Sequence, residues 1–556
     1  MASVVILAGI PGCTEKEIDP SVQTTSLDDR KACTLFYHGK IFTGEGRAEA
    51  IGVCGSTIAF VGHARDFRER RYDTVDLGGR TVVPGIDDAH AHVLGIPGTR
   101  LNTGDFVPGP GPALDEVKDI VRRGTTAHPP GTWLVVTVGE AILADPDATR
   151  FALDPEAPDH PVVLRSWTGH GTVINTQAMR TLGISETEPD PFGGRYVRVA
   201  GSNVLDGVVQ EYAEHLLNRR LFERTSDAEL VASYRAFAER AVRVGYTSIQ
   251  DIPLGLTRER AAKILSMASL PIRVRSICFP LTVDEACDRQ WPAGTSPSGK
   301  TSLSGLKWIT DGTPLERNAF LEEPYADAPD FRGVFNFSDT ALRAMLRRSL
   351  RGEGGKEDRE QPIFHTVGDG ALDDVLDAAR SFGAKAWRGR RFRIEHGDLI
   401  FPRHFAALRS IGATVVQNPL HLALPDLMHE RLGPVRASTM QPLRSLLERG
   451  IGLAFGTDSI GAVASPWLDM YFATTHPTHP SEAISLEQAL VAYTRGAAYV
   501  EFADHEKGTL APGMLADFAV LSQDIFRAPP EDLPSTTSVL TVVDGQIVWD
   551  SGEIAR

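Results

Sequence analysis

Two histidines that are two residues apart, His90 and His92, directly follow an apolar, β-branched run in the stretch TVVPGIDDAHAHVLG. Side chains of a β-strand alternate between its two faces, so residues two apart project from the same side. Two imidazoles that project together can bind one divalent metal ion, and zinc suits nitrogen and oxygen ligands. Two ordinary histidines beside a turn are the alternative, and the pair alone does not decide between these interpretations.

Eight short apolar runs are spread along the chain, and helical patterns separate most of them. The expected strands are Val82–His92, Thr247–Asp251, Ile272–Phe279, Gly305–Thr310, Pro362–Thr366, Phe392–His396, Ala413–Asn418 and Ile451–Asp458. The expected helices are Asp227–Val244, Thr257–Ala268, Asp339–Arg351, Gly370–Phe382, Arg403–Ile411 and Pro442–Arg449. This alternation predicts an α/β fold, a (β/α)8 barrel of the TIM type. An open, doubly wound sheet is the alternative, but no glycine-rich dinucleotide loop follows the first strand.

Six potential ligands lie on these strands, at or near their carboxyl ends: His90, His92, Lys307, His365, His396 and Asp458. In a barrel of this kind the active site lies where the strands end, so the six side chains are expected to converge there. Chance could place one or two such residues at strand ends. The ordered set of six therefore predicts a metal site.

Both ends of the chain carry a different pattern, with short strands and tight turns such as His38-Gly39-Lys40, Cys54-Gly55-Ser56 and Asp544-Gly545. These are hairpin signals. We predict a composite β-sandwich from residues 34–83 and 505–556 and a barrel from residues 84–504. Residues of about 100–225 are too many for one loop, so we expect an insertion after strand one, at the catalytic mouth. Residues 1–33 are expected to form a tail.

Composition excludes several kinds of partner. The 556 residues carry a net charge of -15, which argues against nucleic acid and against an anionic membrane surface. No window approaches the roughly 20 apolar residues of a membrane span.

The five cysteines contain no CxxC motif and indicate neither a disulfide framework nor a thiolate metal site. We expect a cytoplasmic protein, with export as the alternative if MASVVILAGIPGC is a truncated signal.

Between about residue 36 and residue 551 the sequence resembles the amidohydrolase superfamily, in the YtcJ-like branch that includes N-substituted formamide deformylases. The matching stretches are VVPGIDDAHAH, PVVLRSWTGHGTVINTQAM, GYTSIQD, LKWITDGTPLERNAFLEEPYAD, FHTVGDGALDDVLDA, RFRIEHGD, QNPLHLALPD, FGTDS and GTLAPGMLADFAVL. The resemblance implies a barrel with a β-sandwich and a homodimer. The loop KWITDGTPLERNA departs from many relatives, so formamide specificity does not carry over directly.

The same resemblance implies a role for each ligand. His90, His92 and Asp458 would bind the more buried of two metals, and His365 and His396 would bind the second. Lys307 would bridge the two metals if its amine were carboxylated; a salt bridge from Lys307 to Asp311 is the alternative. One ion or two per chain stays open. Metal-bound hydroxide would attack an amide-type C–N bond outside a peptide, with Asp458 as general acid and base.

A second tier of residues is expected to contact a small-molecule substrate: His170, His421, Trp167 and Asp311. Asp311 could instead order the loop after its strand, and Asp88 is expected to fix the turn or a histidine. Deamination of a heterocycle or hydrolysis of a lactone or ester could use the same site, since a fold does not select among them. A non-catalytic structural or regulatory relative is the third alternative, although such relatives typically lose ligands.

Overall fold

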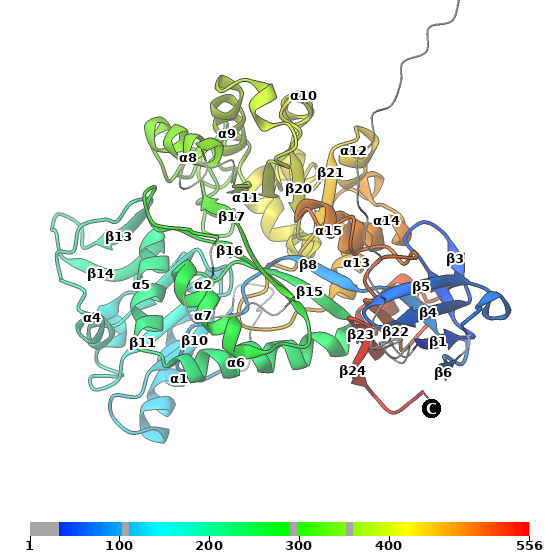
Figure 1. Ribbon diagram of the computed structural model, residues 1–556. Helices are drawn as coiled ribbons and strands as arrows, with labels where there is room; N and C mark the ends of the chain where they lie inside the picture. The colour runs from blue at the N-terminus through cyan, green and yellow to red at the C-terminus, as the bar shows by residue number, and fades with distance from the viewer. Residues whose placement is uncertain are drawn as a thin grey trace, which may run out of the picture.

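Eight parallel strands form the central sheet of the computed structural model, which describes residues 33–69, 71–102, 111–289, 291, 299–351 and 360–554 (Figure 1). In sheet order the strands are β8 (Ile86–Ala91), β15 (Tyr246–Asp251), β16 (Arg273–Cys278), β17 (Thr301–Ile309), β18 (Pro362–Thr366), β19 (Arg393–His396), β20 (Thr414–Gln417) and β21 (Gly452–Phe455). The chain after β21 returns to β8, where the Asp458 amide donates to the His90 carbonyl at 2.8 Å. The sheet therefore closes, and the predicted (β/α)8 fold class is confirmed.

Helices cover the outside of the barrel in the alternation that the sequence predicts. They are α6 (Asp227–Ala241), α7 (Arg258–Ala268), α8 (Asp339–Arg351), α9 (Asp369–Ser381), α10 (Pro402–Ile411), α11 (Pro425–Ala437), α12 (Leu443–Glu448), α13 (Pro466–Thr475), α14 (Leu486–Val491) and α15 (Ala497–Val500). Local signals set their ends: α6 begins at a capping box between Ser226 and Glu229. Both faces of the strands are buried, which explains their continuous apolar runs.

The inside of the barrel below the site is polar and charged. Arg393 is fully buried, forms an ion pair with Glu395 two residues along β19, and donates to the Gln250 side chain at 2.6 Å. Arg275 donates to the Gln361 side chain at 2.8 Å. Because side chains two apart on a strand share a face, Arg393 and Glu395 both point inward. This pairing satisfies charges that would otherwise be costly to bury.

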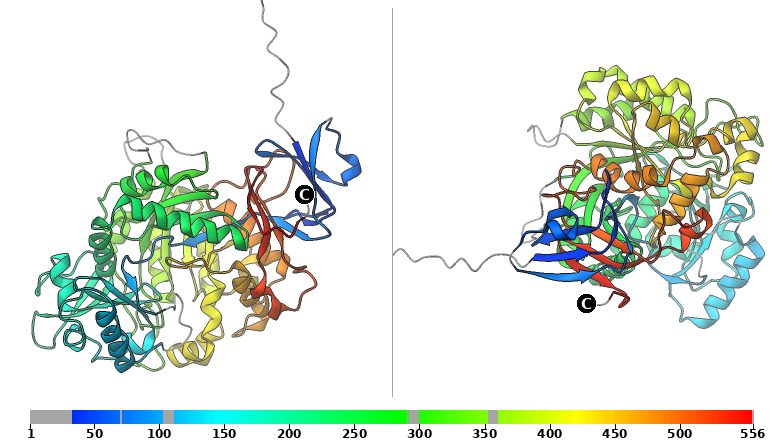
Figure 2. Two further views of the ribbon diagram at one scale, coloured as in Figure 1. Left: turned by 90° about the horizontal axis from the view of Figure 1, so that it is seen from below. Right: turned by 90° about the vertical axis from the view of Figure 1, so that its right-hand side faces the viewer.

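Strands from both ends of the chain form two further sheets, which lie side by side at the right of Figure 1 and are seen again in Figure 2. One sheet has the order β5 (Thr57–Gly62), β4 (Ala50–Cys54), β1 (Cys33–Tyr37) and β6 (Tyr72–Asp76). The other has the order β24 (Gln546–Asp550), β23 (Ser538–Val543), β22 (Phe518–Leu521), β7 (Thr81–Pro84), β2 (Lys40–Phe42) and β3 (Arg47–Ala48). Arg273, at the start of β16, forms ion pairs with Asp517 and Asp544, so these sheets contact the amino ends of the barrel strands.

The predicted turns of these sheets have different outcomes. Asp544-Gly545 joins antiparallel β23 and β24, and both residues have positive φ, as a two-residue hairpin requires. The hairpin at Gly55-Ser56 is also present, between β4 and β5. The hairpin prediction at His38-Gly39 was wrong, because β1 pairs with β4 and β6 whereas β2 pairs with β3 and β7. The chain crosses from one sheet to the other at this turn. The predicted tail, apart from Cys33, lies outside the described residues.

Between β8 and β15 the chain forms a separate six-stranded sheet. In sheet order its strands are β13 (Gly194–Arg198), β14 (Leu205–Glu211), β12 (Gly171–Ile174), β11 (Val162–Ser166), β10 (Leu134–Val138) and β9 (Thr99–Arg100). Its helices are α1 (Leu114–Ala127), α2 (Glu140–Leu143), α3 (Arg150–Leu153), α4 (Thr176–Leu182) and α5 (Tyr212–Glu223). This insertion lies at the left of Figure 1, on the other side of the barrel from the sandwich sheets.

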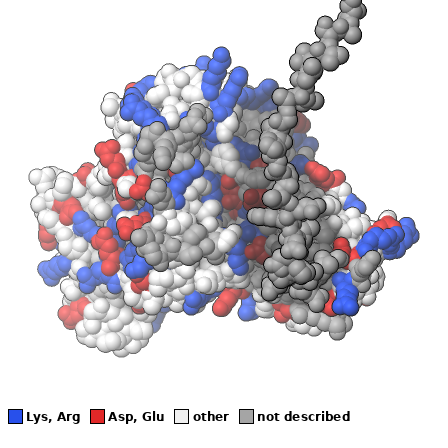
Figure 3. Space-filling model, in the orientation of Figure 1, with Lys and Arg blue, Asp and Glu red and all other residues white. Residues whose placement is uncertain are grey.

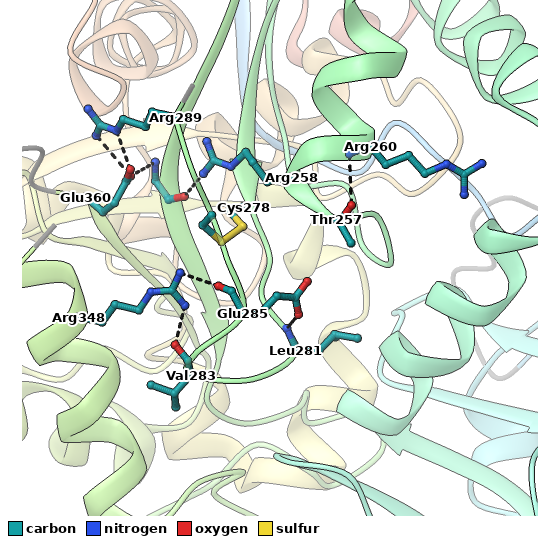
Figure 4. Close-up of a disulfide and its surroundings, with 12 residues drawn as sticks. Thr257, Arg258, Arg260, Cys278, Leu281, Val283, Glu285, Arg289, Arg348 and Glu360 are labelled. Carbon is teal, nitrogen blue, oxygen red and sulfur yellow. Dashed lines mark hydrogen bonds and ion pairs between the residues drawn. A yellow bond between two sulfur atoms is a disulfide. The ribbon is translucent and has the colours of Figure 1, made fainter. Parts of the chain in front are cut away.

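Two disulfides contradict the expectation drawn from the cysteine spacing. Cys33 and Cys54 are cross-strand partners on β1 and β4 and are bonded to each other. Cys278, at the end of β16, is bonded to Cys287 nine residues later (Figure 4). Neither pair has a recognisable motif, because the pairing depends on strand register and loop path and not on sequence spacing.

Several further contacts fix the loop that the second disulfide closes. Arg348 of α8 donates to the carbonyls of Val283 and Glu285, at 2.6 and 2.7 Å (Figure 4). The Glu285 carboxylate accepts from Leu281 within the loop and from Arg219 of α5, at 2.7 and 2.8 Å. The loop therefore ties β16 to α5, a helix of the insertion.

The face shown in Figure 3 mixes acidic and basic side chains. Among the residues that the structure describes, no helix is both long and apolar enough to cross a membrane.

Candidate metal centre

Three of the predicted ligands lie together at the carboxyl end of the barrel. The Asp458 carboxylate lies 3.2 Å from His90 Nε2 and 3.1 Å from His92 Nε2. His90, His396 and Asp458 each offer a ligand atom within 4.8 Å of the others. His90 and His396 are buried, whereas the Asp458 side chain is 20% exposed. The structure thus brings residues of β8, of β19 and of the chain after β21 into one group of metal-ligand size.

Outer partners turn the imidazoles of this group toward one another. His90 Nδ1 forms an ion pair with Glu395, His92 Nδ1 lies 2.7 Å from the Ile252 carbonyl, and His396 Nδ1 lies 2.7 Å from Asn418 Oδ1. An acceptor at Nδ1 fixes the proton there and leaves Nε2 free for a metal. All three rings are held this way, an arrangement that second-sphere partners of metal ligands typically provide.

Lys307 and His365 stand beside this group, and His365 Nε2 lies 3.9 Å from the Asp311 carboxylate. Lys307 Nζ and His365 Nε2 are buried and have no hydrogen-bond partner among the described residues. Burial lowers the pKa of Lys307 to about 8. An unpaired buried amine is costly, so it calls for a partner that the protein chain does not supply. The donor set, with the buried Lys307 amine beside it, therefore fits a divalent metal.

Asp311 does not form the salt bridge that was the alternative for Lys307. Its carboxylate accepts hydrogen bonds from the backbone amides of Val367, Gly368 and Phe320, at 3.1, 2.8 and 2.9 Å. Asp311 is fully buried, and it is not among the residues that line the two cavities described below. This geometry suits the loop-ordering role better than contact with substrate.

Asp88 joins the first strand of the barrel, β8, to the segment that follows the last strand, β21. Its carboxylate accepts from the amides of His90 and Thr457, at 3.1 and 2.9 Å, and from the Thr457 hydroxyl at 2.6 Å. The contact places His90 beside the turn that carries Asp458. Asp458 in that turn and His396 at the end of β19 both have φ near +60°, a conformation that non-glycine residues rarely adopt. Such backbone outliers are typical of functional sites.

A small cavity of about 10 Å³ lies at the centre of the six predicted ligands, all of which line it. The insertion closes it with His170, whose Nδ1 lies 3.2 Å from both carboxylate oxygens of Glu211. The His170 ring centre is 4.6 Å from that of His365. Burial disfavours charge on His170, but Glu211, Glu316 and Asp458 together outweigh burial and raise its pKa to about 9.

A larger, mostly apolar cavity of about 240 Å³ adjoins the first, and Thr168, Asp458 and Ile460 line both. Trp167 and His421, two of the predicted substrate contacts, line the larger cavity, and no lysine or arginine does so among the described residues. Its apolar wall consists of Pro314, Leu315, Leu420, Leu424, Met428, Met440, Ile460, Ala462, Val463 and Ala464.

The charged groups of the larger cavity are paired with one another. His421 Nδ1 lies 2.8 Å from Asp398, and His421 Nε2 lies 3.7 Å from Asp458. Burial disfavours charge on His421, but these two carboxylates outweigh burial and raise its pKa to about 10. The cavity therefore presents an apolar wall and a charged corner at Asp398, His421 and Asp458.

Sequence reasoning gave no role at the site to four residues. Glu395, Glu211, Asp398 and His215 all lie at the site or hold its side chains. A signal existed for Glu395, because Arg393 and Glu395 are opposite charges on one face of a buried strand. His215 follows no barrel strand, so no strand-end pattern indicates it; it lies in the first turn of α5 and lines the small cavity.

Comparison with known proteins agrees with this geometry. The pattern of the amidohydrolase family matches residues 73–549. The chain is 26% identical over 544 residues to YtcJ of Bacillus subtilis (strain 168), a protein named as an amidohydrolase. The alignment covers 93% of this chain and 99% of that protein. It is 25% identical over 543 residues to the N-substituted formamide deformylase of Arthrobacter pascens, and this alignment covers 90% of this chain and 95% of that protein.

A solved structure shares the fold. It is an uncharacterized metal-dependent hydrolase from Pyrococcus horikoshii OT3, with a TM-score of 0.68, 20% sequence identity, and coverage of 90% of this chain and 99% of that one. The family pattern spans most of the chain, and YtcJ matches almost end to end. The chain therefore belongs to the amidohydrolase family, in its YtcJ-like branch, and the resemblance seen in the sequence is confirmed.

Proposed function

We propose that this protein is a metal-dependent amidohydrolase that cleaves a non-peptide C–N bond in an uncharged amide with an apolar substituent. One observation carries the proposal: Asp458 stands between the six-ligand cavity and the large apolar cavity and lines both. An amide placed across Asp458 would have its reacting carbonyl among the ligands and its substituent against the apolar wall. Family membership and the relatives named as an amidohydrolase and a deformylase support it.

In this proposal His90, His92 and Asp458 would hold one ion and His365 and His396 a second, with Lys307 as a carbamate between them. The proposed ion is zinc, which suits these nitrogen and oxygen ligands. A bound divalent metal would lower the pKa of water toward 7 and polarise the substrate carbonyl. The division of ligands stays a prediction, because the group of ligand size in the structure combines His396 with His90 and Asp458.

The chain's own residues supply the proton transfers. Asp458 would accept a proton from the attacking water and deliver it to the departing nitrogen, because an amine leaves poorly until it is protonated. The histidines around Asp458 outweigh its burial and hold its pKa well below the usual range, so it begins as a carboxylate. His170, fixed by Glu211, would direct Nε2 toward the substrate oxygen. The products are a carboxylic acid and an amine.

The larger cavity predicts which amides react best. Leu424→Lys places an ammonium group against the apolar wall, and we expect kcat/KM for an aryl or alkyl amide to fall about 10- to 100-fold, mostly through KM. Val435→Lys is the matched control, since Val435 lies on the adjoining helix α11 and is 76% exposed. Steady-state kinetics on neutral and anionic amides of equal size measure the effect.

An equal loss in both variants would contradict the assigned substrate cavity. The same panel should include an ester and a heterocyclic amine: faster turnover of either than of every amide would move the proposal to the ester hydrolase or the deaminase.

The two disulfides bear on the compartment. Disulfides persist in oxidising compartments and are rare in the cytosol, so we propose export, the alternative to the cytoplasmic location that the sequence suggests. Alkylation of the unfolded, unreduced protein is then expected to leave Cys33, Cys54, Cys278 and Cys287 unlabelled, as peptide mass spectrometry would show. Full labelling of all four in protein taken directly from its source would contradict export. The homodimer that the family resemblance implies stays a prediction, which light scattering would test.

A further inference from the structure

His215 is a buried histidine whose ring nitrogens have no hydrogen-bond partner within the described part of the chain. It is 1% exposed, and neither Nδ1 nor Nε2 has a hydrogen-bond partner among the described residues. His160, another buried histidine of the insertion, has Nε2 3.2 Å from the His128 carbonyl. Buried polar atoms in native proteins are almost always paired. An imidazole with two unpaired nitrogens therefore indicates that a group from outside the chain completes it.

The position of His215 indicates where that group would lie. His215 lines the small cavity together with the six proposed metal ligands and His170. It does not line the large apolar cavity. Its neighbours on the other side are aromatic: the ring centres of Phe279 and Tyr212 lie 4.8 and 5.8 Å from its own. The open side of the imidazole therefore faces the reacting group of a substrate and not its apolar substituent.

The surrounding structure holds His215 in this position. α5 begins directly after Glu211, which has a φ of 56° and bonds His170, so one short segment places both histidines. Phe279 follows Cys278, and the disulfide loop beyond it is bonded to α5 through Glu285 and Arg219. The disulfide loop is therefore tied to the helix that carries His215. Because Phe279 and Tyr212 pack against the His215 ring, the ring loses little entropy when it binds a ligand.

We propose that His215 is a substrate-contacting residue, which hydrogen-bonds the acyl oxygen of the substrate in the small cavity; this rests on the proposed amide hydrolysis. A neutral imidazole offers one donor and one acceptor, and an amide carbonyl needs a donor. His170 binds from the same wall, so the insertion supplies two contacts to the reacting group.

The test uses the metal-loaded protein and formate, the smallest carboxylate. His215→Phe keeps an aromatic ring beside Phe279 and removes both nitrogens. We expect the dissociation constant of formate, measured by calorimetry, to rise about tenfold and kcat/KM for a neutral amide to fall at least as much. Metal content should be unchanged and Tm should not fall, because two unpaired polar atoms are removed. His215→Gln, which keeps a donor, should recover part of the affinity.

His160→Phe is the matched control and should change neither formate affinity nor kcat/KM. Unchanged formate affinity and unchanged kcat/KM in His215→Phe would overturn the proposal. So would the loss of a metal equivalent, which would make His215 a ligand. If the wild-type protein hydrolyses no amide, the proposed function fails, and formate affinity still decides whether His215 contacts an acyl group.

Discussion

His90→Ala is expected to lose bound metal and to lower kcat/KM for amide hydrolysis by about 10³-fold or more. His90 Nε2 lies 3.2 Å from Asp458, and Nδ1 is paired with Glu395, so the ring is oriented by one carboxylate toward the other. Alanine removes the ligand and also leaves Glu395 with one partner fewer in a fully buried position. Metal analysis on the purified variant, beside steady-state kinetics, measures both effects.

The control for this variant is His160→Ala, which removes a buried imidazole that lines neither cavity. It should keep full metal content and activity, whatever its effect on Tm. Full metal content together with full activity in His90→Ala would show that the ligand assignment is wrong. Loss of both in the two variants alike would point to misfolding, which circular dichroism would reveal.

Lys307→Met is expected to lose metal and to reduce activity by roughly 10²-fold or more. The amine has a pKa of about 8 because it is buried, so a neutral fraction exists at neutral pH and can add carbon dioxide to form a carbamate. A carbamate is an anionic oxygen ligand, whereas an ammonium group cannot bind a cation. Mass spectrometry under native conditions should show one added carbon dioxide in the wild-type protein and none in the variant.

Lys507 provides the contrasting buried lysine. Its Nζ forms ion pairs with Asp87 and Glu501, so the chain itself supplies its partners. Lys507→Met leaves those carboxylates uncompensated and should lower stability by about 3–5 kcal/mol while metal content per folded chain stays the same. If Lys307→Met instead kept its metal and activity and gained stability, Lys307 would be a plain buried amine.

The barrel could be predicted because its strands are short apolar runs separated by amphipathic helices. Val82–His92 was expected as one strand, but the structure divides it into β7 and β8 at Gly85. A side chain at Gly85 would overlap the Thr247 hydroxyl at 2.0 Å, so the close approach of a neighbouring strand fixes this break. Such a contact is tertiary, and no local pattern reports it.

The candidate site was predictable where its residues follow strands and not elsewhere. His365 and His396 stand on barrel strands, so alternation and strand order were enough to group them. His215 stands in a helix of the insertion, and its position depends on how α5 packs against Phe279. The crossing at His38 and the pairing of Cys278 with Cys287 likewise depend on how distant segments meet.

The central claim is that a divalent metal bound at the barrel mouth is required for hydrolysis. The most direct test is the metal content per chain of protein purified without chelator, followed by removal and return of zinc while amide turnover is recorded. The account predicts at least one equivalent of divalent metal, loss of turnover on removal, and recovery on return. Protein that contains no metal, takes none up, and still hydrolyses the amide would contradict it.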